Sequence, residues 1–313
     1  MAARFARGPQ GLQSAPSHLK TTGSHTSNRA AICGLVDVFI VEFGMQVLRI
    51  PKGNGKVRVV YAPSEEEKAE LRSLLPALVK IAKRRCNLEV VHGFMPGRSP
   101  LTNALPHVGY QYTVNMDLQD FFDTVLITHV MHLIPPQILA KVMRYGAARQ
   151  GLPTSPLVAN IAAAQLDWDL VTALPEDVVY TRYADDLSFS FDDQKLTKEL
   201  PLLVTKTVED HGFAVNKTKT KVQWAGAGRR IITGIAVDHA RVFATREVRR
   251  KLRAAHHQNN KGSKAGLTEW CRLKLPALYL AEQKRRGKAH KSHHRAEEPT
   301  VEKSNKERRS LRL

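Results

Sequence analysis

Cysteine is scarce in this chain. Its 313 residues contain three cysteines, Cys33, Cys86 and Cys271, which lie far apart and include no C-x-x-C spacing. An odd number of scattered cysteines argues against a disulfide framework and against a structural zinc site. We therefore expect the protein to work in a reducing compartment, which favours a cytoplasmic location.

Long apolar runs are also missing. No segment reaches the roughly 18 apolar residues of a membrane span, and the N-terminus lacks the apolar core and cleavage site of a secretory signal. This pattern predicts no membrane partner.

Acidic residues are also few in comparison with basic residues. The chain has 29 Asp and Glu against 48 Lys and Arg, a formal net charge of +19. Such an excess favours a polyanionic partner, with nucleic acid first and an anionic membrane second. Because membrane signals are missing, nucleic acid is the favoured partner.

An adjacent acidic pair, Asp185 and Asp186, is the most informative feature that is present. It follows a strand-like segment, and Leu187 to Phe191 alternates apolar with small polar residues, which is typical of a half-buried strand. The pair therefore falls at a turn. Two carboxylates about 4 Å apart repel by roughly 1 kcal/mol even in water. A divalent cation bound through oxygen would explain the pair, and a solvated hairpin tip explains this segment equally well.

Strand and helix patterns are mixed without a regular βαβ alternation, which predicts an α+β fold. A Gly-Asn-Gly turn predicts a hairpin over 47–62. Ser64 and Glu67 form a capping box that begins a helix over 65–85, which Pro76 should kink. The other predicted elements are a buried strand over 113–116, helices over 127–144, 157–173 and 194–211, a strand over 213–215, a hairpin over 222–237 and a basic helical region from 245.

A third carboxylate is expected beside the acidic pair. Asp117 follows the predicted strand 113–116, so Asp117, Asp185 and Asp186 could converge from neighbouring strands. Two Mg²⁺ ions held in this way would activate an attacking hydroxyl and neutralise a leaving pyrophosphate. We predict these three residues as ligands of two Mg²⁺ ions, with Mn²⁺ as an alternative.

Four motifs in order resemble those of reverse transcriptases. They are Met-Asp-Leu-Gln-Asp-Phe-Phe (116–122), Gln-Gly-Leu-Pro-Thr-Ser-Pro (150–156), Tyr-Ala-Asp-Asp (183–186) and Gly-Phe-Ala-Val-Asn-Lys-Thr-Lys-Thr (212–220). Two further motifs, Asn103-Ala104-Leu105-Pro106-His107 and Ile232-Thr233-Gly234, are similar to those of the bacterial retron branch. The resemblance covers about residues 47 to 257.

The resemblance implies a right-hand polymerase with fingers and palm, built from an antiparallel sheet plus helices, and a helical basic thumb. The implied division is a flexible basic N-terminus at 1–31, fingers at 32–112, a palm at 113–240 with fingers helices inserted, a thumb at 241–285 and a disordered basic tail at 286–313.

Nucleotide-binding residues follow by matching motifs. Phe122 would lie under the nucleotide sugar and select deoxynucleotides (dNTPs), with core packing as the alternative. Gln150 and Gly151 would contact the incoming dNTP, because glycine lets backbone approach closely. The family usually has Leu-Pro where Ala148-Arg149 stands here, and Arg149 could add a phosphate contact.

Basic residues of the motifs would contact phosphates. Lys52 and Arg58 would bind the triphosphate from the fingers hairpin, although a solvated basic turn is the alternative. Lys219 would act as a catalytic general acid for pyrophosphate, in competition with Lys217 and Lys221.

Nucleic-acid contacts are predicted in two places. Asn103 and His107 lie at helical i, i+4 spacing, and either an RNA contact or a structural role fits them. A cluster at helical spacing would line a groove that follows a duplex backbone, with affinity falling as salt rises. The cluster comprises Arg246, Arg249, Arg250, Lys251 and Arg253, and its four arginines are the predicted nucleic-acid contacts.

The resemblance implies an RNA-directed DNA polymerase of retron type in the bacterial cytoplasm. Such an enzyme adds dNTPs to a primer with Mg²⁺, copies a structured noncoding RNA into RNA-linked single-stranded DNA, and serves antiphage defence with a separate effector protein. The alternatives are a reverse transcriptase of another bacterial class, intron-like or from another defence system, and an RNA-binding scaffold. The sequence leaves open the template RNA, the product length, the effector, the oligomeric state and the role of residues 1–44.

Overall fold

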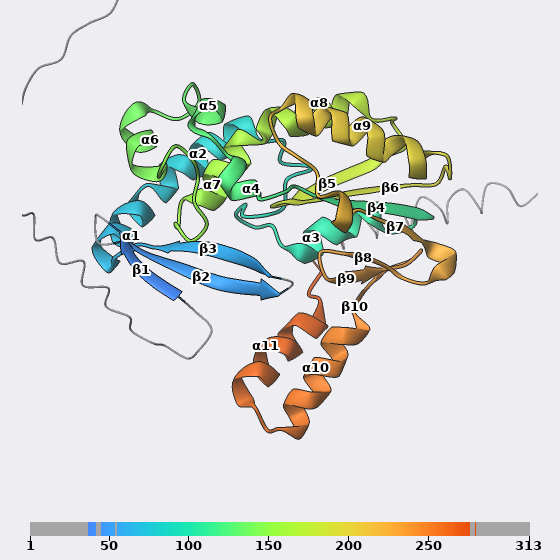
Figure 1. Ribbon diagram of the computed structural model, residues 1–313. Coiled ribbons are helices and arrows are strands. Elements are labelled where there is room, and N and C mark those ends of the chain that lie inside the picture. The colour runs from blue at the N-terminus through green and yellow to red at the C-terminus, as the bar shows by residue number, and fades with distance from the viewer. Residues whose placement is uncertain (1–36, 42–44, 54, 276–278, 280–313) are drawn as a thin grey trace, which may run out of the picture.

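The computed structural model describes residues 37–41, 45–53, 55–275 and 279 of the chain (Figure 1). Helices and three antiparallel sheets are mixed within these residues, so the predicted α+β fold is confirmed. No helix in the described ranges has the length and apolarity needed to cross a membrane. The predicted flexible segments 1–31 and 286–313 lie outside the described residues.

A four-stranded antiparallel sheet with the order β5-β6-β4-β7 lies at the centre of the molecule. Helices α8 (Ala164–Ala173) and α9 (Leu196–Asp210) cover one face of it (Figure 1). The strands are β4 (Tyr112–Asp117), β5 (Val179–Tyr183), β6 (Asp186–Phe191) and β7 (Lys221–Trp224).

Strand β6 is buried on both of its faces. Phe189 and Phe191 are fully buried in the main core, but Ser188 and Ser190 on the opposite face are buried as well. A short helix, α3 (Pro100–Ala104), and a 3₁₀ turn, η1 (Leu105–His107), lie against this second face. The predicted hairpin is present, but the expectation of a solvent-exposed face was wrong because a distant segment covers it.

Two predicted long helices are each divided. The predicted helix 65–85 is α1 (Glu65–Ser73) followed by α2 (Leu75–Arg85), with Pro76 in the first turn of α2. The Ser64 cap is confirmed, since its Oγ accepts from the Glu67 N–H at 3.2 Å. The predicted helix 157–173 is α7 (Ser155–Ala162) followed by α8.

The predicted helix 127–144 was wrong as a single element. It comprises α5 (Ile127–Val130) and α6 (Pro136–Val142), preceded by the short helix α4 (Phe121–Thr124). Pro135 and Pro136 separate them, because proline lacks the N–H of the helical ladder and disfavours helix in the residue before it.

The N-terminal sheet has the order β1-β2-β3. Its strands are β1 (Asp37–Val41), β2 (Met45–Gly53) and β3 (Lys56–Ala62), and β2 and β3 form the hairpin predicted over 47–62. The Tyr61 N–H donates to the Gln150 carbonyl at 2.8 Å. This bond joins the end of β3 to the loop that precedes α7.

The C-terminal part contains a third sheet and two helices. The predicted hairpin 222–237 was wrong in its first strand, because β7 pairs with β4 and the hairpin is β8 (Arg230–Ile232) with β9 (Ile235–Val237). The strand predicted over 213–215 is only an isolated bridge between Leu118 and Val215. The remaining elements are η2 (Lys217–Lys219), η3 (Ala225–Ala227), β10 (Val242–Ala244), α10 (Arg246–His257) and α11 (Lys261–Arg272).

Helices α10 and α11 project from the third sheet as a separate lobe (Figure 1). The Thr245 side chain caps α10 by accepting from the Val248 N–H at 3.3 Å. The helical region predicted from residue 245 is therefore confirmed in its described part. The predicted boundaries of fingers, palm and thumb stay predictions.

Candidate active site

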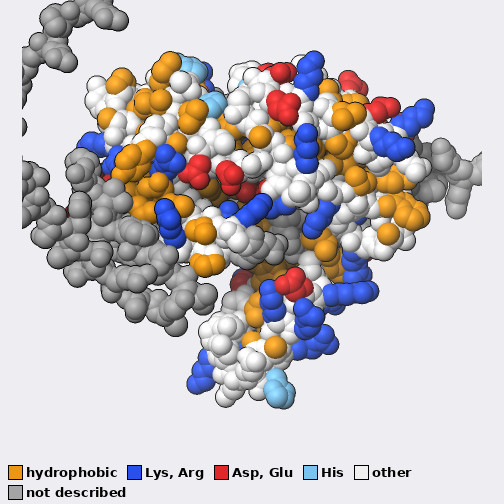
Figure 2. Space-filling model, viewed as in Figure 1, with side chains coloured by type: hydrophobic (Ala, Val, Ile, Leu, Met, Phe, Trp, Pro, Cys, Tyr) orange, Lys and Arg blue, Asp and Glu red, His pale blue; other side chains and the backbone are white. Residues whose placement is uncertain are grey.

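Three carboxylates lie at one end of the central sheet. Asp117, the last residue of β4, pairs directly with Asp186, the first residue of β6, and Asp185 stands in the turn between β5 and β6. Side chains of directly opposed strand residues point to the same face. Figure 2 shows acidic side chains near the centre of the viewed face with lysine and arginine side chains beside them. We call Asp117, Asp185 and Asp186 the acidic cluster.

Backbone hydrogen bonds fix this end of the sheet. The Leu118 N–H donates to the Asp185 carbonyl at 2.9 Å, and the Asn216 N–H donates to the Asp117 carbonyl at 2.7 Å. The first bond joins the two carboxylate-bearing segments, and the second brings the segment of η2 against them.

Lys219 contacts the acidic cluster directly. Its Nζ donates to Asp117 Oδ1 at 2.8 Å and to Oδ2 at 2.9 Å, and this bond raises the pKa of Lys219. Asp117 is buried while the lysine side chain is largely exposed. Of the three lysines considered from sequence, Lys219 is the one at the cluster.

The surroundings of Asp185 and Asp186 disfavour their charged forms and so raise their pKa values. Burial raises the pKa of Asp186 to about 6, and the charges of Asp185 and Asp117 add to the effect. The Asp186 side chain is exposed at the surface. The surrounding protein nevertheless replaces much of the water near its carboxylate, which disfavours the charged form. Burial also raises the pKa of Asp185, which Asp117 reinforces and the charges of Lys219 and Arg58 oppose.

The donor set suits a hard divalent cation, because carboxylate oxygens are the ligands that Mg²⁺ takes. A cation would relieve the repulsion that raises the pKa values of Asp185 and Asp186. In this conformation, the described part of the chain nevertheless contains no group of three His, Cys, Asp or Glu placed to hold a metal. The Lys219 ammonium stands at Asp117 where a cation would bind. The metal ligands therefore stay a prediction.

The predicted triphosphate contacts differ in their placement. Arg58 on β3 is exposed and close enough for its charge to lower the pKa of Asp185. Lys52 is exposed near the end of β2. Of these two residues, Arg58 is the one whose charge is seen to act on the cluster.

The predicted nucleotide loop packs against β3. Gly151 has φ +111°, and a Cβ there would lie 2.2 Å from the Tyr61 carbonyl oxygen. Gln150 accepts the Tyr61 N–H through its carbonyl. Glycine is therefore required by the close approach of the protein's own backbone.

The two predicted aromatic neighbours have different environments. Phe121 is buried in the core, and its ring is tilted against that of Phe213 with centroids 5.7 Å apart. Phe122 is partly buried, and its ring lies 6.2 Å from that of Phe94. This leaves part of the Phe122 ring available to a ligand.

Arg149, where the family usually has proline, makes internal contacts. Its Nη1 donates to Asp123 Oδ1 at 2.9 Å, and its Nε donates to the Arg144 carbonyl at 3.1 Å. Its guanidinium also lies over the rings of Tyr61 and Tyr145. These contacts hold Arg149 against the loop and engage it away from the phosphate role considered from sequence.

Asn103 and His107 are fully buried. The His107 Nδ1 and Nε2 atoms lie 2.8 Å from Ser190 Oγ and 2.7 Å from Thr181 Oγ1. Burial lowers the pKa of His107 to about 3, an effect that the charge of Arg230 reinforces, so the imidazole is neutral. Nucleic acid cannot reach either side chain in this conformation, and of the two roles left open by sequence the structural one fits.

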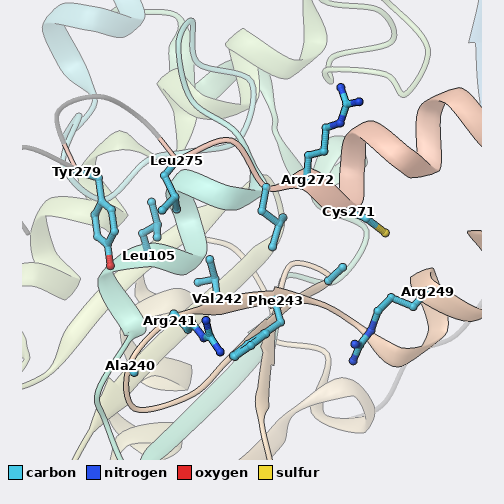
Figure 3. A pocket seen from close by; sticks show the side chains of 12 residues that line it. Leu105, Ala240, Arg241, Val242, Phe243, Arg249, Cys271, Arg272, Leu275 and Tyr279 are labelled. Atoms are coloured by element: carbon cyan, nitrogen blue, oxygen red, sulfur yellow. The ribbon is translucent and has the colours of Figure 1, made fainter.

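The four arginines predicted to contact nucleic acid are exposed on α10. Figure 2 shows lysine and arginine side chains along this lobe. A pocket of about 470 Å³ lies where α11 meets β10 and η1 (Figure 3). Its lining includes the apolar Leu105, Phe243 and Leu275, with Arg241, Arg249 and Arg272 among them. Arg249 therefore belongs both to the exposed arginines of α10 and to the lining of this pocket.

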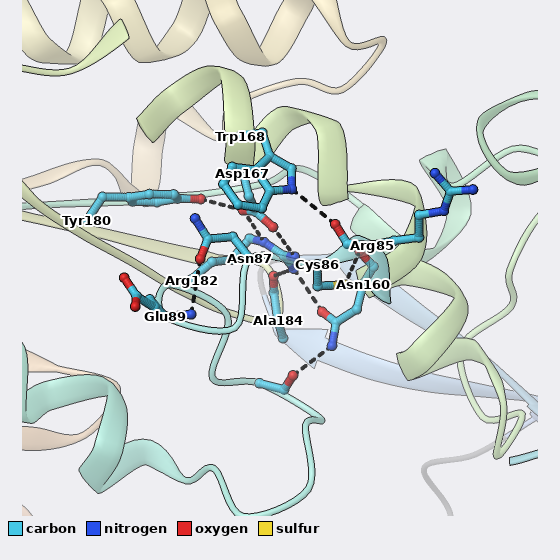
Figure 4. Close-up of polar contacts among 11 residues, drawn as sticks. Arg85, Cys86, Asn87, Glu89, Asn160, Asp167, Trp168, Tyr180, Arg182 and Ala184 are labelled. Atoms are coloured by element: carbon cyan, nitrogen blue, oxygen red, sulfur yellow. Dashed lines mark hydrogen bonds and ion pairs between the residues drawn. The ribbon is translucent and has the colours of Figure 1, made fainter. Parts of the chain in front are cut away.

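Sequence reasoning missed a buried polar network behind the acidic cluster. Arg182 on β5 and Asp167 on α8 are both fully buried and form two hydrogen bonds, Nε to Oδ1 at 2.8 Å and Nη2 to Oδ2 at 2.6 Å (Figure 4). Tyr180 OH also donates to Asp167 Oδ1 at 2.8 Å. The available signal was an arginine inside a strand-like segment, three residues before Asp185.

Comparison with known proteins identifies the family. Residues 50–251 match the family model described as "Reverse transcriptase (RNA-dependent DNA polymerase)". The retron Mx65 and Mx162 reverse transcriptases of Myxococcus xanthus are each 35% identical to this chain, over 237 and 257 residues. These alignments cover 67% and 68% of the chain and 54% and 52% of the relatives. The retron Ec86 reverse transcriptase of Escherichia coli is 28% identical over 236 residues, covering 70% of the chain and 71% of that protein.

The chain spans about half the length of the two Myxococcus relatives. The matched region nevertheless contains the acidic cluster, the nucleotide loop and Lys219. The chain belongs to the reverse transcriptase family, and its relatives support a bacterial retron type.

Proposed function

We propose that this chain is an RNA-directed DNA polymerase of retron type. The observation that carries the proposal is the convergence of Asp117, Asp185 and Asp186 at one sheet end, with Lys219 bound to Asp117. Three carboxylates and an ammonium at one point suit phosphoryl transfer, in which catalysis consists of positioning and charge stabilisation.

The acidic cluster would hold two Mg²⁺ ions, or Mn²⁺ in their place. When bound, these ions would supply activation of the primer hydroxyl and neutralisation of the pyrophosphate charge. Lys219 keeps its proton in this conformation, because the contact with Asp117 raises its pKa. Its Nζ would give that proton to the leaving pyrophosphate once it no longer contacts Asp117.

The dNTP would lie between the β2–β3 hairpin and the central sheet. Arg58 would bind the triphosphate, and Lys52 would approach from the hairpin end. Gln150 and Gly151 would contact the nucleotide from a loop fixed to β3 through Tyr61. The exposed part of Phe122 would meet the sugar and disfavour a 2′-hydroxyl.

The retron type is supported by contact between the two retron-like motifs. Asn103 Nδ2 donates to Thr233 Oγ1 at 3.3 Å, although 130 residues separate them. The template would be a structured noncoding RNA and the product an RNA-linked single-stranded DNA, held partly by the arginines of α10. We extend the proposal to antiphage defence in the bacterial cytoplasm with a separate effector protein.

Primer extension tests the proposal. The purified chain is incubated with oligo(dT) on poly(rA), dTTP and Mg²⁺ or Mn²⁺, and the Asp185→Asn variant is compared with Asp177→Asn, which changes an exposed acid in the turn before β5. We expect synthesis by the wild type and by Asp177→Asn, and none by Asp185→Asn.

Absence of metal-dependent synthesis by the wild type would refute the polymerase function. Binding of RNA without synthesis would then favour the scaffold alternative. Sequencing of copurifying nucleic acid addresses the finer proposal, because a retron-type enzyme should retain an RNA joined to DNA. Recovery of unjoined RNA and DNA alone would point to another class of reverse transcriptase.

A further inference from the structure

The turn that carries Asp185 and Asp186 is supported from behind by buried side chains. Besides its two bonds to Asp167, Arg182 uses Nη1 to donate to Asn160 Oδ1 at 2.9 Å and to the Ala184 carbonyl at 3.2 Å (Figure 4). Ala184 immediately precedes Asp185. One guanidinium therefore connects helices α7 and α8 to the turn.

The Ala184 backbone needs such support. Its φ is +58°, a left-handed conformation that alanine rarely adopts. A strained conformation persists only where its surroundings determine it. The Arg182 bond to the Ala184 carbonyl is a contact that favours this orientation of the peptide.

A second support reaches the turn from the segment before α3. The His92 N–H donates to the Arg182 carbonyl at 2.8 Å. A Cβ on Gly93 would lie 2.2 Å from the Ala184 nitrogen, so the two backbones are in close contact. Asn160 joins both supports, because its Nδ2 donates to the Gly93 carbonyl at 2.8 Å.

We propose that Arg182, Asn160 and Gly93 form a turn clamp that sets the position of Asp185 and Asp186 for catalysis. They are positioning residues, since they act through the Ala184 peptide. The clamp rests on the proposed polymerase function, which gives the acidic cluster its role.

The geometry argues for more than stability. A buried arginine is neutralised by Asp167 alone, yet Arg182 directs a further N–H toward Asn160 and Ala184. Burial by itself would lower the pKa of Arg182, but Asp167 raises it overall, so the guanidinium stays charged. Its planar array of donors reaches four acceptor atoms on three residues, whereas a lysine ammonium has only three N–H donors.

The test compares lysine substitutions at two fully buried arginines. Arg182→Lys keeps the charge beside Asp167 but loses the fixed donor to Ala184. Arg230→Lys is the matched control, because Arg230 is equally buried and donates to Thr113 Oγ1 and the His107 carbonyl, away from the turn. Both are assayed on oligo(dT)/poly(rA), with active sites counted from the burst of the first turnover and melting temperatures measured in parallel.

For Arg182→Lys we expect kcat per active site to fall by at least ~10-fold, since small displacements of reacting groups have effects of up to about 100-fold. The Mg²⁺ concentration for half-maximal activity should rise, while the Kd for primed template stays within about 2-fold. Arg230→Lys should change the melting temperature but neither kinetic quantity.

Two further variants keep the test decisive if Arg182→Lys does not fold. Gly93→Ala pushes on the Ala184 nitrogen without changing the Arg182 side chain. Asn160→Asp keeps the acceptor for Arg182 but loses the donor to Gly93. In both variants the Mg²⁺ concentration for half-maximal activity should rise, as in Arg182→Lys. The rise should be smaller in Asn160→Asp than in Gly93→Ala.

The inference is overturned if the folded clamp variants keep the wild-type kcat per active site and the wild-type Mg²⁺ dependence. It is also overturned if Arg230→Lys changes these two quantities as much as Arg182→Lys does. In either case an active wild type and an inactive Asp185→Asn would leave the proposed function standing. An inactive wild type would instead refute the function itself.

Discussion

Removing one charge from the acidic cluster should stabilise the metal-free protein. The pKa of Asp186 is raised from 3.8 to about 6, and each pKa unit corresponds to about 1.4 kcal/mol. The full shift would correspond to about 3 kcal/mol, but solvent reaches this side chain and screens it. We therefore expect Asp186→Asn to raise the free energy of unfolding by about 1 kcal/mol, or the melting temperature by about 3 °C.

The pH dependence gives this prediction its sign. Because the carboxyl pKa is higher in the folded state, the native protein binds a proton that the unfolded chain lacks between about pH 4 and pH 6. The contribution of Asp186 to stability therefore decreases as pH rises through this window. The difference between wild type and Asp186→Asn should be full near pH 7.5 and nearly absent near pH 4.

Thermal melting in EDTA across this pH range measures the effect, and Asp177→Asn serves as a control for loss of an exposed acid. Added Mg²⁺ should raise the melting temperature of the wild type more than that of Asp186→Asn, since a ligand stabilises the state that binds it. If Asp186→Asn melts at or below the wild type near pH 7.5 in EDTA, the electrostatic reasoning about this cluster is wrong.

Three further predictions concern substrate binding. Phe122→Val should lower discrimination of dTTP over UTP by about 10-fold in primer extension, and unchanged discrimination would assign Phe122 to packing alone. Gly151→Ala should lower the free energy of unfolding in urea by about 1–3 kcal/mol, because its Cβ would meet the Tyr61 carbonyl. It should also lower kcat/KM for dTTP. If both quantities stay at their wild-type values, the loop can move. Arg250→Ala should reduce the slope of log affinity against log salt for primed RNA by about 0.7–0.9 if it contacts one phosphate, whereas an unchanged slope would place the duplex elsewhere.

Local signals in the sequence were sufficient for several elements. The Ser64 cap depends on residues three positions apart, and the β2–β3 hairpin depends on a short turn between two strand-like segments. The acidic pair at the β5–β6 turn was found for the same reason. Each of these features is determined by neighbours in the chain, so the sequence pattern alone contains the information.

Features that depend on distant pairing were not predictable in this way. The alternation in β6 correctly indicated two faces, but α3 and η1 cover the serine face. β7 looked like half of a hairpin, yet it pairs with β4 more than one hundred residues earlier. Which segment covers a face is decided by the whole packing arrangement, which periodicity does not report.

The motif left the role of two residues open. Asn103 and His107 were considered as RNA contacts because their motif is similar to that of the retron branch, with a structural role as the alternative. Their partners, Thr233, Ser190 and Thr181, come from three other strands or turns. Buried polar groups need such partners, and the partners are visible only once those elements are placed together.

The acidic cluster and the buried network behind it answer one physical problem. Burial raises the pKa values of Asp185 and Asp186, and repulsion from neighbouring carboxylates adds to it, so carboxylates that repel one another have to be held together by the surrounding structure. The Leu118–Asp185 and Asn216–Asp117 backbone bonds restrain the end of β4 and the turn. Lys219 offsets part of the charge at Asp117, and the turn clamp restrains Ala184 from inside the core. The turn where Asp185 and Asp186 emerge is therefore restrained from several directions, whereas Asp117 is contacted by a lysine whose side chain is largely exposed.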